Sequence, residues 1–292
     1  MSTIILLTVT GLGLGALYFL VASGLSLIYG LMGVLNFAHG SFLTLGAFIG
    51  WQAAQALGAG GWGVFFISLA VGAATGAAFA ALTERILIRP LYQRHIEQVL
   101  VTVGLSLASV ALFEGIWGTD PSFITGPAWL KETTDLFGAR IPNDRFVAIL
   151  AAALVLGGLL LFLKKTRYGM IIRAGVENRS MVTALGIDVR KAFTLVFTIG
   201  GAAAGLGGVL ASHYFGYVSP LLGGSLLIFA FIVTVIGGLG SLTGAALASV
   251  AVGILQQFAN FYWGVGDFVV VLLLAAVLLA RPAGLMGKAV TA

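Results

Sequence analysis

Two long stretches of this chain carry no formal charge. The first 83 residues contain no Asp, Glu, Lys or Arg, and none occurs between Lys191 and Asp267. Only 9% of the 292 residues are charged and 60% are apolar, whereas about 25% of the residues of an average soluble domain are charged. The chain therefore lacks the polar surface of a water-facing globule. This excludes a soluble enzyme and a nucleic-acid-binding protein and predicts an integral membrane protein.

The hydropathy pattern distinguishes helices from a membrane barrel. A membrane-spanning strand alternates apolar and polar side chains over about ten residues, whereas these runs are apolar on every side for about twenty. The predicted fold is therefore all-α, a polytopic transmembrane helical bundle in which residues 1–292 form a single domain. The 42 glycines then indicate close helix packing, through spaced pairs such as Gly72 with Gly76 and Gly201 with Gly205.

About 20 residues cross a 30 Å hydrocarbon core, so spans can be placed between the glycine-rich breaks. We expect about nine spans, or eight with re-entrant segments in place of full crossings. The first apolar run lacks the basic start and the cleavage site of a signal peptide, so we expect it to be a retained span. The predicted spans are 4–29, 41–57, 64–84, 98–117, 146–163, 192–212, two within 223–263, and 264–280.

The basic residues predict the orientation, because cytoplasmic loops carry an excess of Lys and Arg. Twelve of the 15 fall on one side of the predicted bundle, which we expect to be cytoplasmic. The N-terminus then lies outside and the C-terminus inside. Residues 118–145 form the one sizeable external loop, and residues 164–191 form the main cytoplasmic loop. The twelve are Arg85, Arg89, Arg94, Lys164, Lys165, Arg167, Arg173, Arg179, Arg190, Lys191, Arg281 and Lys288.

The main cytoplasmic loop contains a short amphipathic segment. From Glu177 to Leu185 the sequence predicts about two helical turns, ended by Gly186, which tolerates a positive φ. Met181, Ala184 and Leu185 share one face of this helix. Its small apolar face suits insertion into the groove of a partner protein. The alternative is a helix that lies flat on the bilayer with its basic residues on anionic lipid.

Two glycine-bounded interruptions lie on the predicted cytoplasmic side. The first holds Asn36, His39 and Ser41, and we interpret it as a gate or hinge of a substrate path. Unwound backbone is tolerated in a membrane where it lines a cavity or is buried in protein. The structural alternative is that Asn36 caps the next helix and that a backbone carbonyl satisfies His39. The second, comparable candidate consists of Gly237, Gly238, Gly240 and Ser241.

Few polar side chains lie inside the predicted spans. Glu114 and Asp267 sit near the outer ends of their spans, where snorkelling to the headgroups competes with a functional role. Gln256 and Asn260 share one helix face, and hydrogen bonding between helices is favoured over substrate contact. The chain has no cysteine and no Gly-x-x-x-x-Gly-Lys-Ser/Thr phosphate loop. We therefore predict no catalytic residue, metal site or cofactor on this chain.

Several segments of the sequence resemble the permease subunits of branched-chain amino acid ABC importers. The longest reads Gly-Leu-Met-Gly-Val-Leu-Asn-Phe-Ala-His-Gly-Ser-Phe at 30–42 and is followed by Gly-Ala-Phe-Ile-Gly at 46–50. The others are 177–188, 200–210 and 235–244. The chain is similar to the shorter of the two homologous permeases of such systems.

The resemblance implies a division of labour at a bacterial inner membrane. An external substrate-binding protein delivers the substrate, and two permeases form the path, the second being a homologue or another copy of this chain. Two ATPase subunits hold ATP and Mg and bind a cytoplasmic coupling helix. Membrane lipid is the remaining partner, and nucleic acid is not one. The coupling residues implied here are Glu177, Met181, Ala184, Leu185 and Gly186.

The sequence does not identify the transported substrate. Branched-chain or related amino acids are the first expectation, and urea, an amide or another small solute is the alternative within the same class. An ion-coupled secondary transporter is a rival from a different class. It is disfavoured because no paired acid and base can be recognised within the predicted spans.

Overall fold

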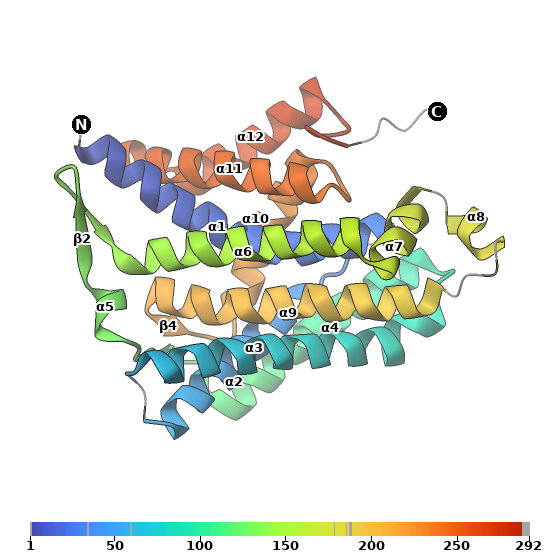
Figure 1. The fold of residues 1–292 in the computed structure, drawn as a ribbon, viewed down its shortest axis with the longest axis horizontal. Coiled ribbons are helices and arrows are strands. Elements are labelled where there is room, and N and C mark those ends of the chain that lie inside the picture. Colours follow the sequence, from blue (N-terminus) through green and yellow to red (C-terminus); the bar gives the residue numbers. More distant parts are fainter. Residues whose placement is uncertain are drawn as a thin grey trace.

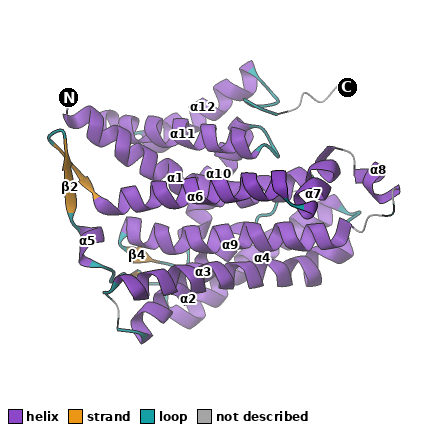
Figure 2. Cartoon of the chain, in the orientation of Figure 1, coloured by secondary structure: helices purple, strands orange, loops and turns teal. Residues whose placement is uncertain are grey.

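A computed structural model describes residues 2–33, 35–58, 60–177, 179–184, 186 and 189–287. Most of these residues are helical, and most of the long helices run side by side along one axis (Figure 1). Figure 2 shows that strands occupy only a small part of the described chain, at one end of the bundle. The predicted polytopic helical bundle is confirmed.

The long helices follow the predicted spans. Six described helical segments are long and apolar enough to cross a membrane, and α10 and α12 are shorter apolar helices. The number of full crossings therefore stays a prediction. The long elements are α1 (Ser2–Met32), α2 (His39–Ala56), α3 (Trp62–Thr83), α4 (His95–Trp117), α6 (Asn143–Lys165), α9 (Val189–Phe215), α10 (Leu222–Gly237), α11 (Leu242–Trp263) and α12 (Gly266–Ala280).

Shorter elements fill the connections. Helix α3 continues into a π-helix, η1 (Glu84–Ile88), and a 3-10 turn, η2 (Arg89–Leu91). The predicted external loop folds into β1 (Ser122–Phe123), α5 (Ala128–Lys131), β2 (Thr133–Leu136) and β3 (Ala139–Pro142). Strands β2 and β3 form an antiparallel hairpin, and β1 pairs with β4 (Tyr217–Val218). An all-α prediction misses these strands because none exceeds four residues.

The two ends of the bundle differ in content. The N-terminal end of α1 and the β2–β3 hairpin lie at one end in Figure 1. Helices α7 (Arg167–Glu177) and α8 (Arg179–Ala184) lie at the opposite end. This arrangement places the predicted external loop and the predicted cytoplasmic loop on opposite sides. Which end faces the cytoplasm stays a prediction.

Helices α1 and α9 form the centre of the bundle. Helix α1 packs against α9, α10 and α11, and α9 also packs against α2 and α3. Their buried side chains include Leu20 on α1 and Phe193 on α9. Helices α4 and α6 are outer helices that expose apolar side chains such as Leu107 and Leu154, as expected for surfaces that face lipid.

Glycines bring the backbones of α3 and α9 together. A Cβ atom on Gly76 would lie 2.9 Å from the Cα of Gly205, and one on Gly205 would lie 3.0 Å from the carbonyl carbon of Gly72. Gly201 packs against the backbone of Gly76 as well. The predicted role of the spaced glycine pairs in close helix packing is confirmed here.

Candidate functional site

The segment between α1 and α2 turns back into the bundle. His39, the first residue of α2, is fully buried, and its Nε2 lies 3.1 Å from the carbonyl oxygen of Val21, near the middle of α1. The interpretation that a backbone carbonyl bonds to His39 is confirmed for Nε2, whereas the buried Nδ1 has no hydrogen-bond partner among the described residues. The Asn36 side chain accepts a hydrogen bond from the Ala38 N–H at 3.1 Å. Asn36 is nevertheless not the helix cap, because residues 37–38 form a turn and Ala38 is the N-cap, without a side-chain cap.

The first turn of α2 meets the first turn of α10 inside the bundle. The Thr44 hydroxyl donates to the Gly40 carbonyl at 3.1 Å and accepts from the Gly223 N–H at 3.0 Å. A Cβ on Gly40 would lie 2.7 Å from the Gly223 carbonyl oxygen, so only glycine fits there. Ser41 is buried beside this contact, with 4% of its surface exposed. Two helix N-termini, each with a partial positive charge, are thus brought together.

The second interruption, between α10 and α11, is a tightly built turn. Gly238 has a φ of 99° and Gly240 a φ of 83°, values that favour glycine. Ser241 is the N-cap of α11, and its hydroxyl accepts from the Gly244 N–H at 3.1 Å. Gly240 faces Gly30 near the end of α1. The two interruptions therefore lie at different depths along α1, since His39 faces its middle.

The described C-terminal segment closes the end of α10. The N–H groups of Leu285 and Met286 donate to the carbonyls of Ile236 and Gly237 at 2.8 and 3.0 Å. These carbonyls belong to the last turn of α10 and have no partner within the helix. The tail therefore satisfies them and packs beside the predicted gate glycines Gly237 and Gly238.

The predicted coupling segment is helical at the residues that the structure describes. Glu177 is the last residue of α7, and Met181 and Ala184 lie on α8. Asn178 and Leu185 lie outside the described residues, so the single helix from Glu177 to Leu185 stays a prediction. Ile172 on α7 and Val182 on α8 are both buried.

The exposed face of α8 contains two of the predicted coupling residues. Met181 is 55% exposed and Ala184 is also exposed, whereas Val182 is buried. Gly186 has a φ of 78°, which agrees with the positive φ expected where the helix stops. Leu185 and the Glu177 side chain lie outside the described residues.

A cavity of about 670 Å³ lies between α1, α4, α10, α11 and α12, toward the end of the bundle that carries β1 and β4. This volume is within the range of about 300–1,000 Å³ that is usual for small-molecule sites. Apolar side chains form much of the wall, and Tyr18 stacks on Phe229 with ring centroids 5.0 Å apart. The lining residues include Leu14, Tyr18, Glu114, Ser225, Leu226, Phe229, Gln256, Gln257, Asn260 and Asp267.

Hydrogen bonds link three helices along one wall of this cavity. The Tyr18 hydroxyl donates to Oε1 of Gln256 at 2.7 Å, and Nε2 of Gln256 donates to Oδ1 of Asp267 at 2.7 Å. Gln256 on α11 therefore bonds to both α1 and α12, which confirms the interpretation that it joins helices. It lines the cavity as well, so the two roles considered from the sequence are compatible.

Two acids and a helix N-terminus give the cavity its polar character. Glu114 and Asp267 line it, and among the described lining residues there is no Lys, Arg or His. The first turn of α10 contributes Leu222 and Ser225, where the helix dipole is positive. The cavity thus offers acceptors for a cationic group, a positive end for an anionic group and apolar walls for a hydrocarbon side chain.

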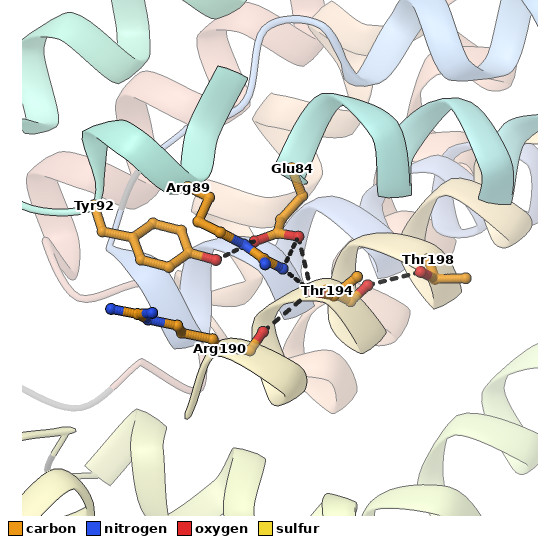
Figure 3. Close-up of polar contacts among 6 residues, drawn as sticks. All are labelled: Glu84, Arg89, Tyr92, Arg190, Thr194 and Thr198. Carbon is orange, nitrogen blue, oxygen red and sulfur yellow. Dashed lines mark hydrogen bonds and ion pairs between the residues drawn. The ribbon is translucent and has the colours of Figure 1, made fainter. Parts of the chain in front are cut away.

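Sequence analysis missed a buried polar cluster at the other end of the bundle (Figure 3). The Glu84 side chain is fully buried, and three other labelled side chains surround its carboxylate in Figure 3. It accepts from Nε and Nη2 of Arg89 at 3.2 and 3.1 Å, from the Thr194 hydroxyl at 2.8 Å, and from the Tyr92 hydroxyl. Burial first, and the Glu84 carboxylate second, raise the pKa of Tyr92, so its hydroxyl stays protonated and donates. We call Glu84, Arg89, Tyr92 and Thr194 the Glu84 cluster.

The sequence offered only a partial signal for this cluster. Glu84 ends the first uncharged stretch, and Arg89 follows it closely, which suggests an ion pair at the end of a span. Thr194 is 110 residues further on, and a lone threonine gives no indication of its partner. No group of three or more His, Cys, Asp or Glu suited to a metal ion occurs within the described part of the chain.

Comparison with known proteins gives consistent matches along the chain. The family model described as "Branched-chain amino acid transport system / permease component" matches residues 7–280. The permease protein BraD of a high-affinity branched-chain amino acid transport system in Pseudomonas aeruginosa is 32% identical over 291 residues, covering 96% of this chain and 94% of BraD.

Two further relatives show how far the sequence similarity extends. The corresponding permease protein LivH of Escherichia coli K12 is 30% identical over 289 residues, covering 95% of this chain and 94% of LivH. The fructose import permease protein FruF of Bifidobacterium longum is 31% identical over 258 residues, covering 85% of this chain and 69% of FruF. Since the family model spans nearly the whole chain, the protein belongs to the permease component family of branched-chain amino acid transport systems.

Proposed function

We propose that this chain is the transmembrane permease subunit of an ATP-driven importer for branched-chain or related amino acids in a bacterial inner membrane. The match of the family model to residues 7–280 is the observation that carries the proposal. The N-terminus lies outside and the C-terminus in the cytoplasm, in accord with the charge asymmetry. The chain forms the path and performs no catalysis, because ATP and Mg are bound by partner subunits.

The outer cavity is the proposed entry to the path. An amino acid carries an ammonium, a carboxylate and a side chain. Asp267 and Glu114 attract the ammonium, the first turn of α10 attracts the carboxylate, and Leu226 and Phe229 contact the hydrocarbon. These interactions replace part of the hydration that a zwitterion loses on entering the membrane, where an uncompensated charge is costly.

The junction of α2 and α10 is the proposed gate beyond this cavity. His39 and Ser41 lie at the start of α2, where Gly40 contacts Gly223 of α10. Leu222 of the same α10 turn lines the outer cavity. A small separation of these two helix starts would open the bundle near the middle of α1. The turn at Gly237, Gly238, Gly240 and Ser241 is the matching inner hinge.

The exposed face of α8 is the proposed contact with the ATPase subunits. Met181 and Ala184 project from it, and Glu177, Leu185 and Gly186 complete the proposed coupling segment. Closure of two ATPase subunits around ATP moves this segment, and the helices rock between outward-open and inward-open states. The remaining partners are a homologous permease or a second copy of this chain, an external substrate-binding protein and membrane lipid.

Reconstitution tests this function. The chain is copurified with its partners, identified by mass spectrometry, and placed in liposomes with the binding protein and labelled leucine. We expect leucine uptake that requires ATP and the ATPase subunits. Uptake by the chain alone under an ion gradient would instead identify a secondary transporter and overturn the proposal.

A second cargo class is supported by one observation. The similarity to the fructose import permease FruF, 31% identity over 85% of this chain, links this fold to an uncharged solute as well. Competition with unlabelled leucine, urea, an amide or fructose separates the classes. Inhibition by leucine alone supports the amino-acid assignment, whereas inhibition only by a neutral solute assigns the importer to that solute.

A further inference from the structure

The Glu84 cluster joins two parts of the chain that are distant in sequence (Figure 3). Glu84 lies where α3 ends and the connection to α4 begins. Thr194 lies 110 residues later, near the start of α9. Helix α9 begins at Val189, shortly after α8. The cluster therefore connects the helix that follows the cytoplasmic segment with a helix from the first third of the chain.

The π-helix η1 brings Glu84 and Arg89 together. In an α-helix of 3.6 residues per turn, residues five apart are separated by about 140° around the axis. A π-helical turn closes between residues i and i+5, so the two side chains point to the same side. Arg89 then places Nε and Nη2 on the two carboxylate oxygens of Glu84, and its Nη2 also donates to the Thr194 hydroxyl at 2.7 Å.

The contact between α3 and α9 continues beyond the cluster. Phe193 packs edge-on against Tyr92, with ring centroids 4.7 Å apart. Further along, Ala80 of α3 lies against Gly201 of α9, and the backbones of Gly76 and Gly205 touch. Such close-packed surfaces shift together rather than deform. Helix α3 therefore follows α9 as long as their cytoplasmic ends are held together.

Helix α8 lies at the end of the bundle, and the contacts described for it are mainly with one neighbouring helix. It packs mainly on α7, with Val182 buried and Met181 55% exposed. A force on α8 can reach the membrane helices along two routes, through α7, which packs on α6, α1 and α9, or along the chain into α9. The second route meets the Glu84 cluster at the first turns of α9.

We infer that the Glu84 cluster is a positioning element of transport, which carries movement of α8 through the start of α9 into α3. The inference rests on the proposed function, because it takes the ATPase contact to lie on α8. When the Thr194–Glu84 bond is removed, the first turns of α9 move without α3. ATP hydrolysis then continues, but fewer substrate molecules cross for each ATP consumed.

The test uses the complete transporter in liposomes, with the binding protein and leucine, and measures leucine transported per ATP hydrolysed. Thr194→Val removes the hydroxyl and keeps the side-chain shape. Thr194→Ser keeps the hydroxyl and serves as the rescue variant. Thr198→Val is the matched control, since the Thr198 hydroxyl donates to the Thr194 carbonyl of its own helix, at 2.7 Å, and no other hydrogen bond is described for it.

We expect Thr194→Val to lower the ratio roughly tenfold or more, because the hydroxyl bonds to two charged side chains, Glu84 and Arg89, with ATPase activity within about twofold of wild type. Thr194→Ser and Thr198→Val keep the wild-type ratio. If Thr194→Val does not assemble, Tyr92→Phe removes another donor to Glu84 and is expected to lower the ratio in the same way. An unchanged ratio, or equal losses of transport and hydrolysis, overturns the inference.

The same experiment separates this inference from the proposed function. A wild-type complex that neither hydrolyses ATP nor moves leucine overturns the proposed function, and the inference with it. A wild-type complex that is active, with an unchanged ratio in Thr194→Val, overturns the inference alone.

Discussion

The outer cavity and the Glu84 cluster place carboxylates in opposite situations. Glu84 is fully buried and accepts from Arg89, Tyr92 and Thr194. Asp267 is exposed at the cavity, and the one hydrogen bond described for it comes from Gln256. One acid has its acceptor capacity taken up by the protein, whereas the other retains capacity for a ligand.

This difference separates two uses of an acid near a membrane. A buried carboxylate with a complete set of donors holds helices in one arrangement, because breaking the set leaves a charge unpaired. A carboxylate with few partners beside a cavity is available to a cationic group. The number of donors, rather than the mere presence of an acid, distinguishes the two regions. Substitutions in the two regions test this distinction.

The largest effect is expected on removing the acid of the cluster. Glu84→Ala leaves the Arg89 guanidinium without its partner, and Arg89 is 37% exposed. We expect the free energy of unfolding to fall by about 2–3 kcal/mol, less than the ~3–5 kcal/mol for a fully buried pair, since water can reach Arg89. Thermal unfolding in detergent measures this. Glu97→Gln is the control, because its pair with Arg94 is exposed at 3.8 Å and contributes less than about 1 kcal/mol.

A second prediction tests whether α3 and α9 form one packed unit above the cluster. In Gly76→Val the new side chain meets the backbones of Gly201 and Gly205. We expect a loss of about 2 kcal/mol from overpacking, again measured by thermal unfolding. Gly104→Val is the control, since a Cβ on Gly104 of α4 meets nothing within 4 Å. Equal losses in the two variants would contradict the packed unit.

The third prediction concerns the charge at the cavity. Asp267→Asn keeps an oxygen that can accept from Gln256 and removes the negative charge. For an amino acid cargo we expect uptake at limiting substrate to fall about tenfold, or about 1.4 kcal/mol, with thermal stability unchanged. For urea or a sugar we expect a change below about twofold, because a neutral solute presents no ammonium. A matching loss of thermal stability would show that Asp267 is structural, like Glu84.

The smallest effect is expected at Tyr18. Tyr18→Phe removes the hydroxyl that donates to Gln256 and keeps the ring that stacks on Phe229. Neutral hydrogen bonds contribute about 0.5–1.5 kcal/mol, so we expect the KM of transport to rise by about two- to threefold with little change in stability. A KM equal to that of wild type would place the Tyr18–Gln256 bond outside the substrate site.

The helices could be predicted from the sequence because a membrane demands long apolar segments. The predicted span 64–84 corresponds to α3 at Trp62–Thr83, and 98–117 to α4 at His95–Trp117. The stop at Gly186 was also predictable, since a positive φ favours glycine. These features depend on residues close together in the sequence.

The contacts of the candidate site were less accessible to sequence reasoning. The partners of Gln256 lie on α1 and α12, and only the tendency of an amide to bond between helices could be inferred. Glu84 and Thr194 meet only because α3 and α9 pack together, and no local pattern encodes that pairing.

The backbone pairing of Leu285 and Met286 with the last turn of α10 has a practical consequence for handling this protein. If the chain were truncated before residue 284 to attach a purification tag, the N–H donors for the Ile236 and Gly237 carbonyls would be lost. The turn between α10 and α11 would then be exposed to water. Tags and fluorescent fusions should therefore be joined after Gly287, so that Leu285 and Met286 keep their hydrogen bonds to the end of α10.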